Sequence, residues 1–68
     1  MTHTLALPSG RKIRSSSQRR FILVMDSMQT NPAILKRSDS LPTLRKHRFD
    51  KNLFAAVIVD QVSGRVVV

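Results

Sequence analysis

Two stretches of the chain are largely apolar, and both predict buried strands. The first covers residues 19–26 and includes FILVM, while the second covers residues 53–60 and reads LFAAVIVD. A continuous apolar run that ends at polar residues is typical of a strand that is buried on both faces of its sheet. A short buried helix is the alternative for the first run, although helices are usually longer than this.

Two weaker apolar stretches predict further strands at the edges of the same sheet. Residues 33–35 (AIL) pass directly into Lys36 and Arg37, two cations that would protect a sheet edge from unwanted pairing. Residues 65–68 (RVVV) follow a short loop in which Gly64 can take a positive φ angle. The apolar pattern therefore predicts four strands, two central and two at the edges.

The segment between the second and third predicted strands, SDSLPTLRKHRFDKN, predicts a helix at about residues 40–49. Ser38 or Ser40 can cap its N-terminus by accepting a hydrogen bond from an unpaired backbone N–H. Pro42 is tolerated there because the first turn of a helix has no intrahelical donors to lose. Three apolar residues are expected to attach the helix to the core: Leu41, Leu44 and Phe49.

These elements predict a small α+β domain with the order ββαββ. An antiparallel sheet with the strand order 2-1-3-4 would place the two fully apolar strands in the centre and one helix on one face. The second face of such a sheet also needs cover. A homodimer, or docking on a larger partner, would cover it. The alternative is that Leu5, Leu7 and Ile13 fold over this face from the N-terminal segment.

Residues 1–18 are expected to form a flexible basic arm, separate from a domain that covers residues 19–68. Pro8 and Gly10 mark a turn or a flexible point. The three serines at positions 15–17 favour disorder over helix.

Residues 1–25 contain no acidic residue and are rich in Arg and Ser, which is also the composition of an organellar transit peptide. Such peptides act as amphipathic helices, and Pro8 and Gly10 interrupt this one. We therefore expect a cytoplasmic protein, with an organellar location after removal of the N-terminal segment as the alternative.

Composition limits the chemistry that the chain can perform. It has 68 residues, two histidines that are far apart, and no cysteine, so disulfides and thiolate metal sites are excluded and no metal or cofactor is expected. Ser38, His47 and Asp50 could be assembled into a triad on paper, but no nucleophile-elbow sequence surrounds them. No apolar run approaches the roughly 20 residues that a membrane span requires. We predict a binding protein rather than an enzyme.

Charge is the best indication of what is bound. Twelve Lys and Arg against four Asp give a formal net charge of +8. Phosphate backbones attract such a chain because each neutralised phosphate releases counterions. The predicted contact residues for nucleic acid, DNA or RNA, or for an acidic partner, are Arg11, Lys12, Arg14, Arg19, Arg20, Lys36, Arg37, Arg45, Lys46, Arg48 and Lys51. With no Trp or Tyr, and with three Phe assigned to the core or to docking, base-specific recognition is not predicted.

The alternative function is contact with an acidic protein surface. In size and layout the chain resembles compact proteins of bacteriophages and mobile elements, although no motif carries this resemblance. It implies a small inhibitor or adaptor that docks on the acidic, nucleic-acid-binding surface of a host protein. Ser15, Ser16 and Ser38 follow basic residues, as kinase sites do, and phosphate there would lower the positive charge.

Overall fold

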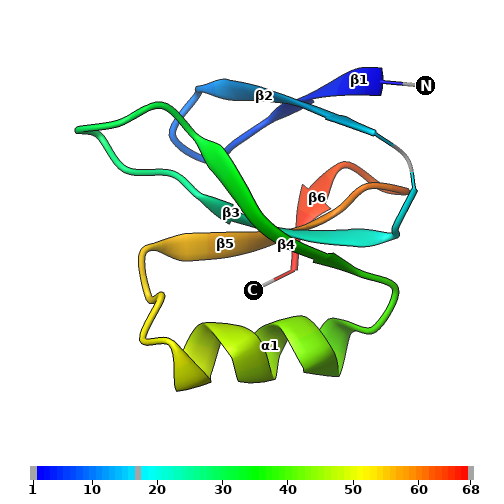
Figure 1. Ribbon diagram of the computed structural model, residues 1–68. Coiled ribbons are helices and arrows are strands. Elements are labelled where there is room, and N and C mark those ends of the chain that lie inside the picture. The colour runs from blue at the N-terminus through cyan, green and yellow to red at the C-terminus, as the bar shows by residue number, and fades with distance from the viewer. Residues whose placement is uncertain (1, 17, 68) are drawn as a thin grey trace.

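The computed structural model describes residues 2–16 and 18–67, which form three layers (Figure 1). A two-stranded sheet lies on one side of a four-stranded sheet, and a helix lies on the other side. The elements are β1 (Thr2–Ala6), β2 (Lys12–Ser16), β3 (Phe21–Met25), β4 (Ala33–Ser38), α1 (Leu41–Asp50), β5 (Ala56–Asp60) and β6 (Arg65–Val66). The predicted α+β class is confirmed.

The two apolar runs form the central strands of the four-stranded sheet. Its order is β4-β3-β5-β6, and each pair of neighbours is antiparallel. The side chains of β3 alternate between the two faces, so Ile22 belongs to one core cluster and Leu23 to the other. Both are fully buried, which explains why this strand has no polar position.

One edge strand, β4, contains an irregularity that the sequence pattern did not predict. Leu23 lies opposite Lys36 and Val24 lies opposite Ile34, so Leu35 is an extra residue in β4. A bulge of this kind leaves its extra residue unpaired. Leu35 is accordingly exposed although it belongs to the apolar stretch that predicted the strand.

The helix begins where the capping pattern predicted. The Oγ of Ser40 accepts a hydrogen bond from the N–H of Thr43 at 3.4 Å, so Ser40 is the N-cap. Leu44 is fully buried and Leu41 packs beside it against the core. The expectation that Phe49 also attaches the helix is wrong, because 70% of its surface is exposed.

The flexible arm predicted for residues 1–18 is the main correction. β1 and β2 form an antiparallel hairpin in which Leu5 lies opposite Ile13. The turn is closed by hydrogen bonds from the N–H of Leu7 to the carbonyl of Arg11 (2.8 Å) and from the N–H of Gly10 to the carbonyl of Leu7 (2.9 Å). Gly10 has a φ of 87°, a conformation that glycine adopts at little cost. The chain order therefore differs from ββαββ, because two strands precede the four expected ones.

The hairpin covers the second face of the four-stranded sheet. Leu5 and Leu7 are buried in one cluster with Ile22, Val24 and Val59. This was the alternative to association that the sequence left open, and burial of apolar surface provides its driving force. With the hairpin in place, this face does not require a second copy of the chain to cover it.

Candidate anion-binding surface

All four Asp carboxylates of the chain are engaged in ion pairs. Each lies within 4.0 Å of a different Lys or Arg: Arg11–Asp26 at 3.6 Å, Arg19–Asp39 at 3.0 Å, Arg20–Asp60 at 3.2 Å and Lys46–Asp50 at 3.7 Å. Because the chain has twelve Lys and Arg, eight have no carboxylate partner among the described residues. Those eight side chains account for the formal net charge of +8.

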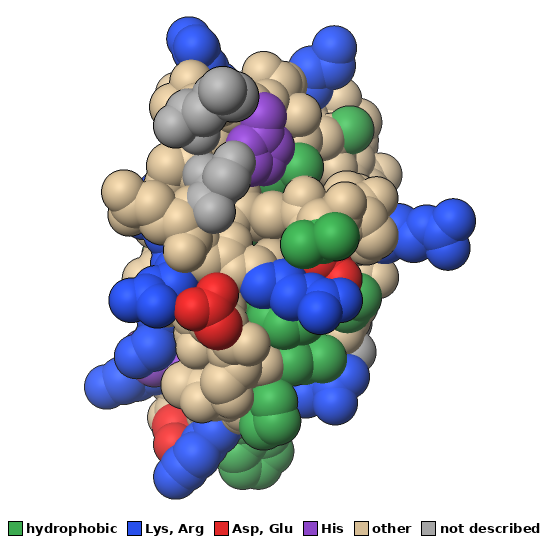
Figure 2. Space-filling view, turned by 90° about the vertical axis from the view of Figure 1, so that its right-hand side faces the viewer, with side chains coloured by type: hydrophobic (Ala, Val, Ile, Leu, Met, Phe, Trp, Pro, Cys, Tyr) green, Lys and Arg blue, Asp and Glu red, His purple; other side chains and the backbone are tan. Residues whose placement is uncertain are grey.

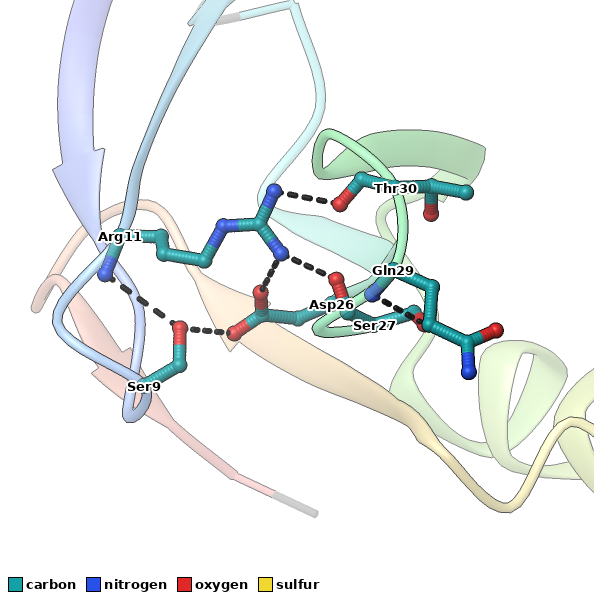
Figure 3. A network of polar contacts seen from close by, with 6 residues as sticks. All are labelled: Ser9, Arg11, Asp26, Ser27, Gln29 and Thr30. Carbon is teal, nitrogen blue, oxygen red and sulfur yellow. Dashed lines mark hydrogen bonds and ion pairs between the residues drawn. The ribbon is translucent and has the colours of Figure 1, made fainter.

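Arg11 is held by the fold and is not free to reach a phosphate. Its guanidinium faces Asp26 and donates to the backbone carbonyls of Ser27 and Thr30, as Figure 3 shows. The Oγ of Ser9 donates to the same carboxylate, which is only 6% exposed. These contacts connect the turn of the hairpin to the loop between β3 and β4, so Arg11 has a structural role.

Arg20 organises the opposite end of the sheet. Its Nε and Nη2 donate to the two carboxylate oxygens of Asp60 at 3.4 and 3.2 Å, and its guanidinium carbon lies 5.2 Å from the ring centroid of Phe21. Asp60 also accepts from the N–H of Val62 at 2.9 Å, in the turn that leads to β6. The hydrogen bonds from the Arg20 side chain hold the pKa of Asp60 below its ordinary value of 3.8, although burial acts in the opposite direction.

Arg19 is paired at the surface with Asp39, which follows β4. The Asp39 carboxylate accepts from the backbone N–H of Arg20 at 2.8 Å and from Nη1 of Arg19 at 3.0 Å. The backbone hydrogen bond is the larger cause of the lowered pKa of Asp39. Both side chains are more than half exposed, so this ion pair contributes little to the stability of the fold.

The eight cations without a carboxylate are distributed over all three layers. Seven belong to the set predicted from the sequence, and Arg65 was missed because it stands alone before three valines. All are exposed except Arg48, which is half-buried. They are Lys12, Arg14, Lys36, Arg37, Arg45, Arg48, Lys51 and Arg65.

These cations do not gather into one patch. Lys12 and Arg14 are exposed on β2 and alternate with the inward-facing Ile13, so they lie on the outer face of the hairpin. Lys36 and Arg37 are consecutive on β4 and project to opposite faces of the sheet. Figure 2 shows Lys and Arg side chains projecting from several separate places, with the visible acidic side chains lying beside some of them. The four-stranded sheet therefore separates the cations of the hairpin from those of the helix layer.

Two phenylalanines that were assigned to the core or to docking form an exposed cluster with a cation. The rings of Phe49 and Phe54 meet edge to face, with centroids 6.5 Å apart and planes at 84°. The guanidinium carbon of Arg48 lies 5.9 Å from the Phe54 centroid. Only Phe21, among the three phenylalanines, is buried. The helical spacing carried a signal for this, since Phe49 is five positions after Leu44 and thus about 140° away from it around the helix.

A metal site and a membrane-spanning helix have no geometric basis in residues 2–16 and 18–67. No three His or Asp side chains of this part of the chain come together in a way that could hold a metal ion. Within the same residues, α1 is too short and too polar to cross a membrane. Comparison with known proteins found no matching family model, no similar curated protein and no similar solved structure.

Proposed function

We propose that the protein is a small, non-enzymatic binder of nucleic acid that contacts the phosphate backbone without reading the base sequence. One observation carries this proposal: four ion pairs use every Asp carboxylate, and eight cations have no carboxylate partner within residues 2–16 and 18–67. Such an excess of positive charge repels itself in the free protein. Binding to a polyanion relieves this repulsion, and each phosphate contact also releases counterions.

The placement of the cations supports contact with the backbone over recognition of a defined sequence. A sequence-reading protein presents side chains from one element to the base edges of a groove. Here the unpaired cations lie on the hairpin, on an edge strand and on the helix layer, in directions that no single groove can receive. Such a distribution suits a strand that bends around the protein, or several backbone segments bound at once.

The test is fluorescence anisotropy of a labelled duplex and a labelled single strand of about 20 nucleotides, titrated at several salt concentrations. We expect binding at micromolar protein or tighter near physiological salt. The logarithm of the binding constant should fall linearly and steeply with the logarithm of the salt concentration, and unrelated sequences should bind similarly. Absence of binding to both nucleic acids near physiological salt would overturn the proposal.

A second candidate is docking on an acidic protein surface, as an inhibitor or adaptor would do. The observation that favours it is the presence of two exposed apolar side chains at opposite ends of the sheet, Met28 in the β3–β4 loop and Val62 in the β5–β6 turn. Protein interfaces use apolar anchors of this kind together with charge. In this case the protein would bind one partner stoichiometrically, and replacing Met28 or Val62 by Ser would weaken that complex.

A further inference from the structure

The aromatic cluster formed by Phe49 and Phe54 is exposed to an extent that is unusual for a chain of this size. Phe49 and Phe54 are 70% and 59% exposed, in a protein that has only three aromatic residues and a small core. Burying a Phe side chain stabilises a fold by about 1.5–3 kcal/mol, and this fold forgoes that gain twice. Contiguous exposed apolar surface on a small protein commonly marks a binding site.

The cluster is held in place by Arg48. The Nε of Arg48 donates to the carbonyl of Ala56 at 2.9 Å, and its Nη2 donates to the carbonyl of Phe54 at 3.0 Å. These two bonds fix both the guanidinium plane and the segment that carries Phe54. The Phe54 ring, in turn, meets Phe49 edge to face. Phe49 lies in the last turn of α1 and is the more exposed of the two residues, so the helix presents most of this side chain to solvent.

The surroundings of the cluster are positively charged. Arg45 precedes Phe49 by one helical turn, Lys51 follows it by two positions, and Arg48 adjoins Phe54. The one acidic residue in this segment, Asp50, is paired with Lys46. An apolar partner surface would gain nothing from these cations. A ligand that combines a flat π-face with a negative backbone would use both features.

We propose that Phe49, supported by Phe54 and Arg48, is a stacking platform for an unpaired base, and that the protein binds single-stranded nucleic acid in preference to duplex. This inference rests on the proposed function and adds to it the form of nucleic acid that is bound. Stacking of a base on an aromatic ring tolerates any sequence, because every base has a π-face. In a duplex the base faces are covered by their neighbours and cannot reach the ring. Arg48 is a positioning residue here, since its Nε and Nη2 donate to the carbonyls of Ala56 and Phe54 and hold the segment that carries the Phe54 ring.

The experiment compares three labelled probes by anisotropy at one moderate salt concentration. They are a single strand of about 10 nucleotides, a strand of the same length in which abasic units replace the nucleosides, and the corresponding duplex. The abasic strand keeps the phosphates and removes the stacking. We expect the wild-type protein to bind the base-containing strand at least about fivefold more tightly than the abasic strand.

Substitutions then assign that preference to the platform. Phe49→Ala should lower affinity for the base-containing strand towards that for the abasic strand, and should leave binding of the abasic strand unchanged. Phe49→Tyr should retain the preference, whereas Phe49→Leu, which is apolar but cannot stack, should lose it. Leu35→Ala is the matched control, because Leu35 is an exposed apolar residue at the β4 bulge and belongs to neither proposed binding surface. Far-UV circular dichroism and thermal unfolding verify that each variant is folded.

Arg48→Lys tests the positioning role. This substitution keeps the positive charge and removes the pair of guanidinium hydrogen bonds to the carbonyls of Phe54 and Ala56. The preference for the base-containing strand should therefore decrease, while the affinity for the abasic strand should stay the same. Equal affinity for the two single strands, or an unaltered preference in Phe49→Leu, would overturn the platform and leave the backbone proposal intact. Failure of the protein to bind any of the three probes would overturn both.

Discussion

Arg11 and Asp26 form the polar connection between two layers of the protein: Nη1 of the arginine lies 3.6 Å from Oδ1 of the aspartate (Figure 3). The arginine precedes β2 in the hairpin, and the aspartate follows β3 in the central sheet. A residue that looked like part of a phosphate-binding arm is thus a contact that fixes the hairpin over the sheet.

Replacing Arg11 by Ala should therefore destabilise the fold more than it weakens ligand binding. The Asp26 carboxylate would lose its ion-pair partner and the carbonyls of Ser27 and Thr30 would lose their donor, and an uncompensated buried charged group costs about 1–3 kcal/mol or more. Urea unfolding followed by far-UV circular dichroism measures this loss. Lys12→Ala, next in sequence and without a carboxylate partner, is the control and should change the free energy of unfolding by no more than about 0.5 kcal/mol.

Truncation of Leu5 tests whether the hairpin is part of the core. Leu5→Ala should lower the free energy of unfolding by about 2–5 kcal/mol, because it leaves a cavity against Ile22 and Val59. Ala6→Ser, at an exposed position of the same strand, should be nearly neutral. Unfolding curves for Leu5→Ala that coincide with those of the wild type would mean that the hairpin does not pack on the sheet in solution.

The ion pairs of Asp39 and Asp60 predict how stability depends on pH. Both pKa values are lower in the folded protein than the ordinary value of 3.8, so folding favours the ionised carboxylates. Their contribution is present above the unfolded-state pKa and is lost as the pH falls through the folded-state pKa. The free energy of unfolding should thus fall as the pH is lowered from about 5 to below 4.

Asp60→Asn isolates one of these two groups. The variant should be less stable than the wild type at neutral pH, since Arg20 loses its ionised partner. It should also lose less stability on acidification, because one of the two shifted carboxylates is gone. Two curves of unfolding free energy against pH that run parallel would contradict this assignment.

The division of the cations into paired and unpaired ones predicts their effects on nucleic-acid binding. Lys36→Ala combined with Arg37→Ala removes two unpaired charges and should reduce the salt slope of binding by up to about 2. Arg19→Ala combined with Asp39→Ala removes an ion pair and leaves the net charge unchanged. If the second double variant lowered the affinity and slope as much as the first, the division would have no functional meaning.

The main strands and the helix could be predicted from the sequence because their signals are local. FILVM has no polar position and can only be buried on both faces, and Ser40 is a strong cap before a helical pair of leucines. The hairpin was missed because its inward-facing positions include two polar residues, His3 and Ser15. These two polar residues weaken the alternation of apolar and polar positions, which Leu5 and Leu7 continue up to the turn of the hairpin.

The types of residue in the candidate site could be predicted from the sequence, but the ion pairs between them could not. Whether an arginine is free depends on which carboxylate the fold brings to it, and Arg20 and Asp60 are forty positions apart. Strand register decides that proximity, and register cannot be read from composition. Phe49 is different, because its angle from Leu44 follows from their spacing along the helix and lies outside the buried stripe of α1.

The pairing of β3 with β5 joins two segments that are made at different times during translation. Translation at about 5–20 residues per second makes FILVM seconds before residues 56–60, which form its second neighbouring strand. Until residues 56–60 pair with it, FILVM is an uncharged, strand-forming segment of the type that seeds aggregation wherever it is exposed. Arg19 and Arg20 directly precede it, and charges in such flanking positions oppose the stacking of apolar segments between chains. In the folded protein the same two arginines pair with Asp39 and Asp60, so one pair of residues serves solubility before folding and stability after it.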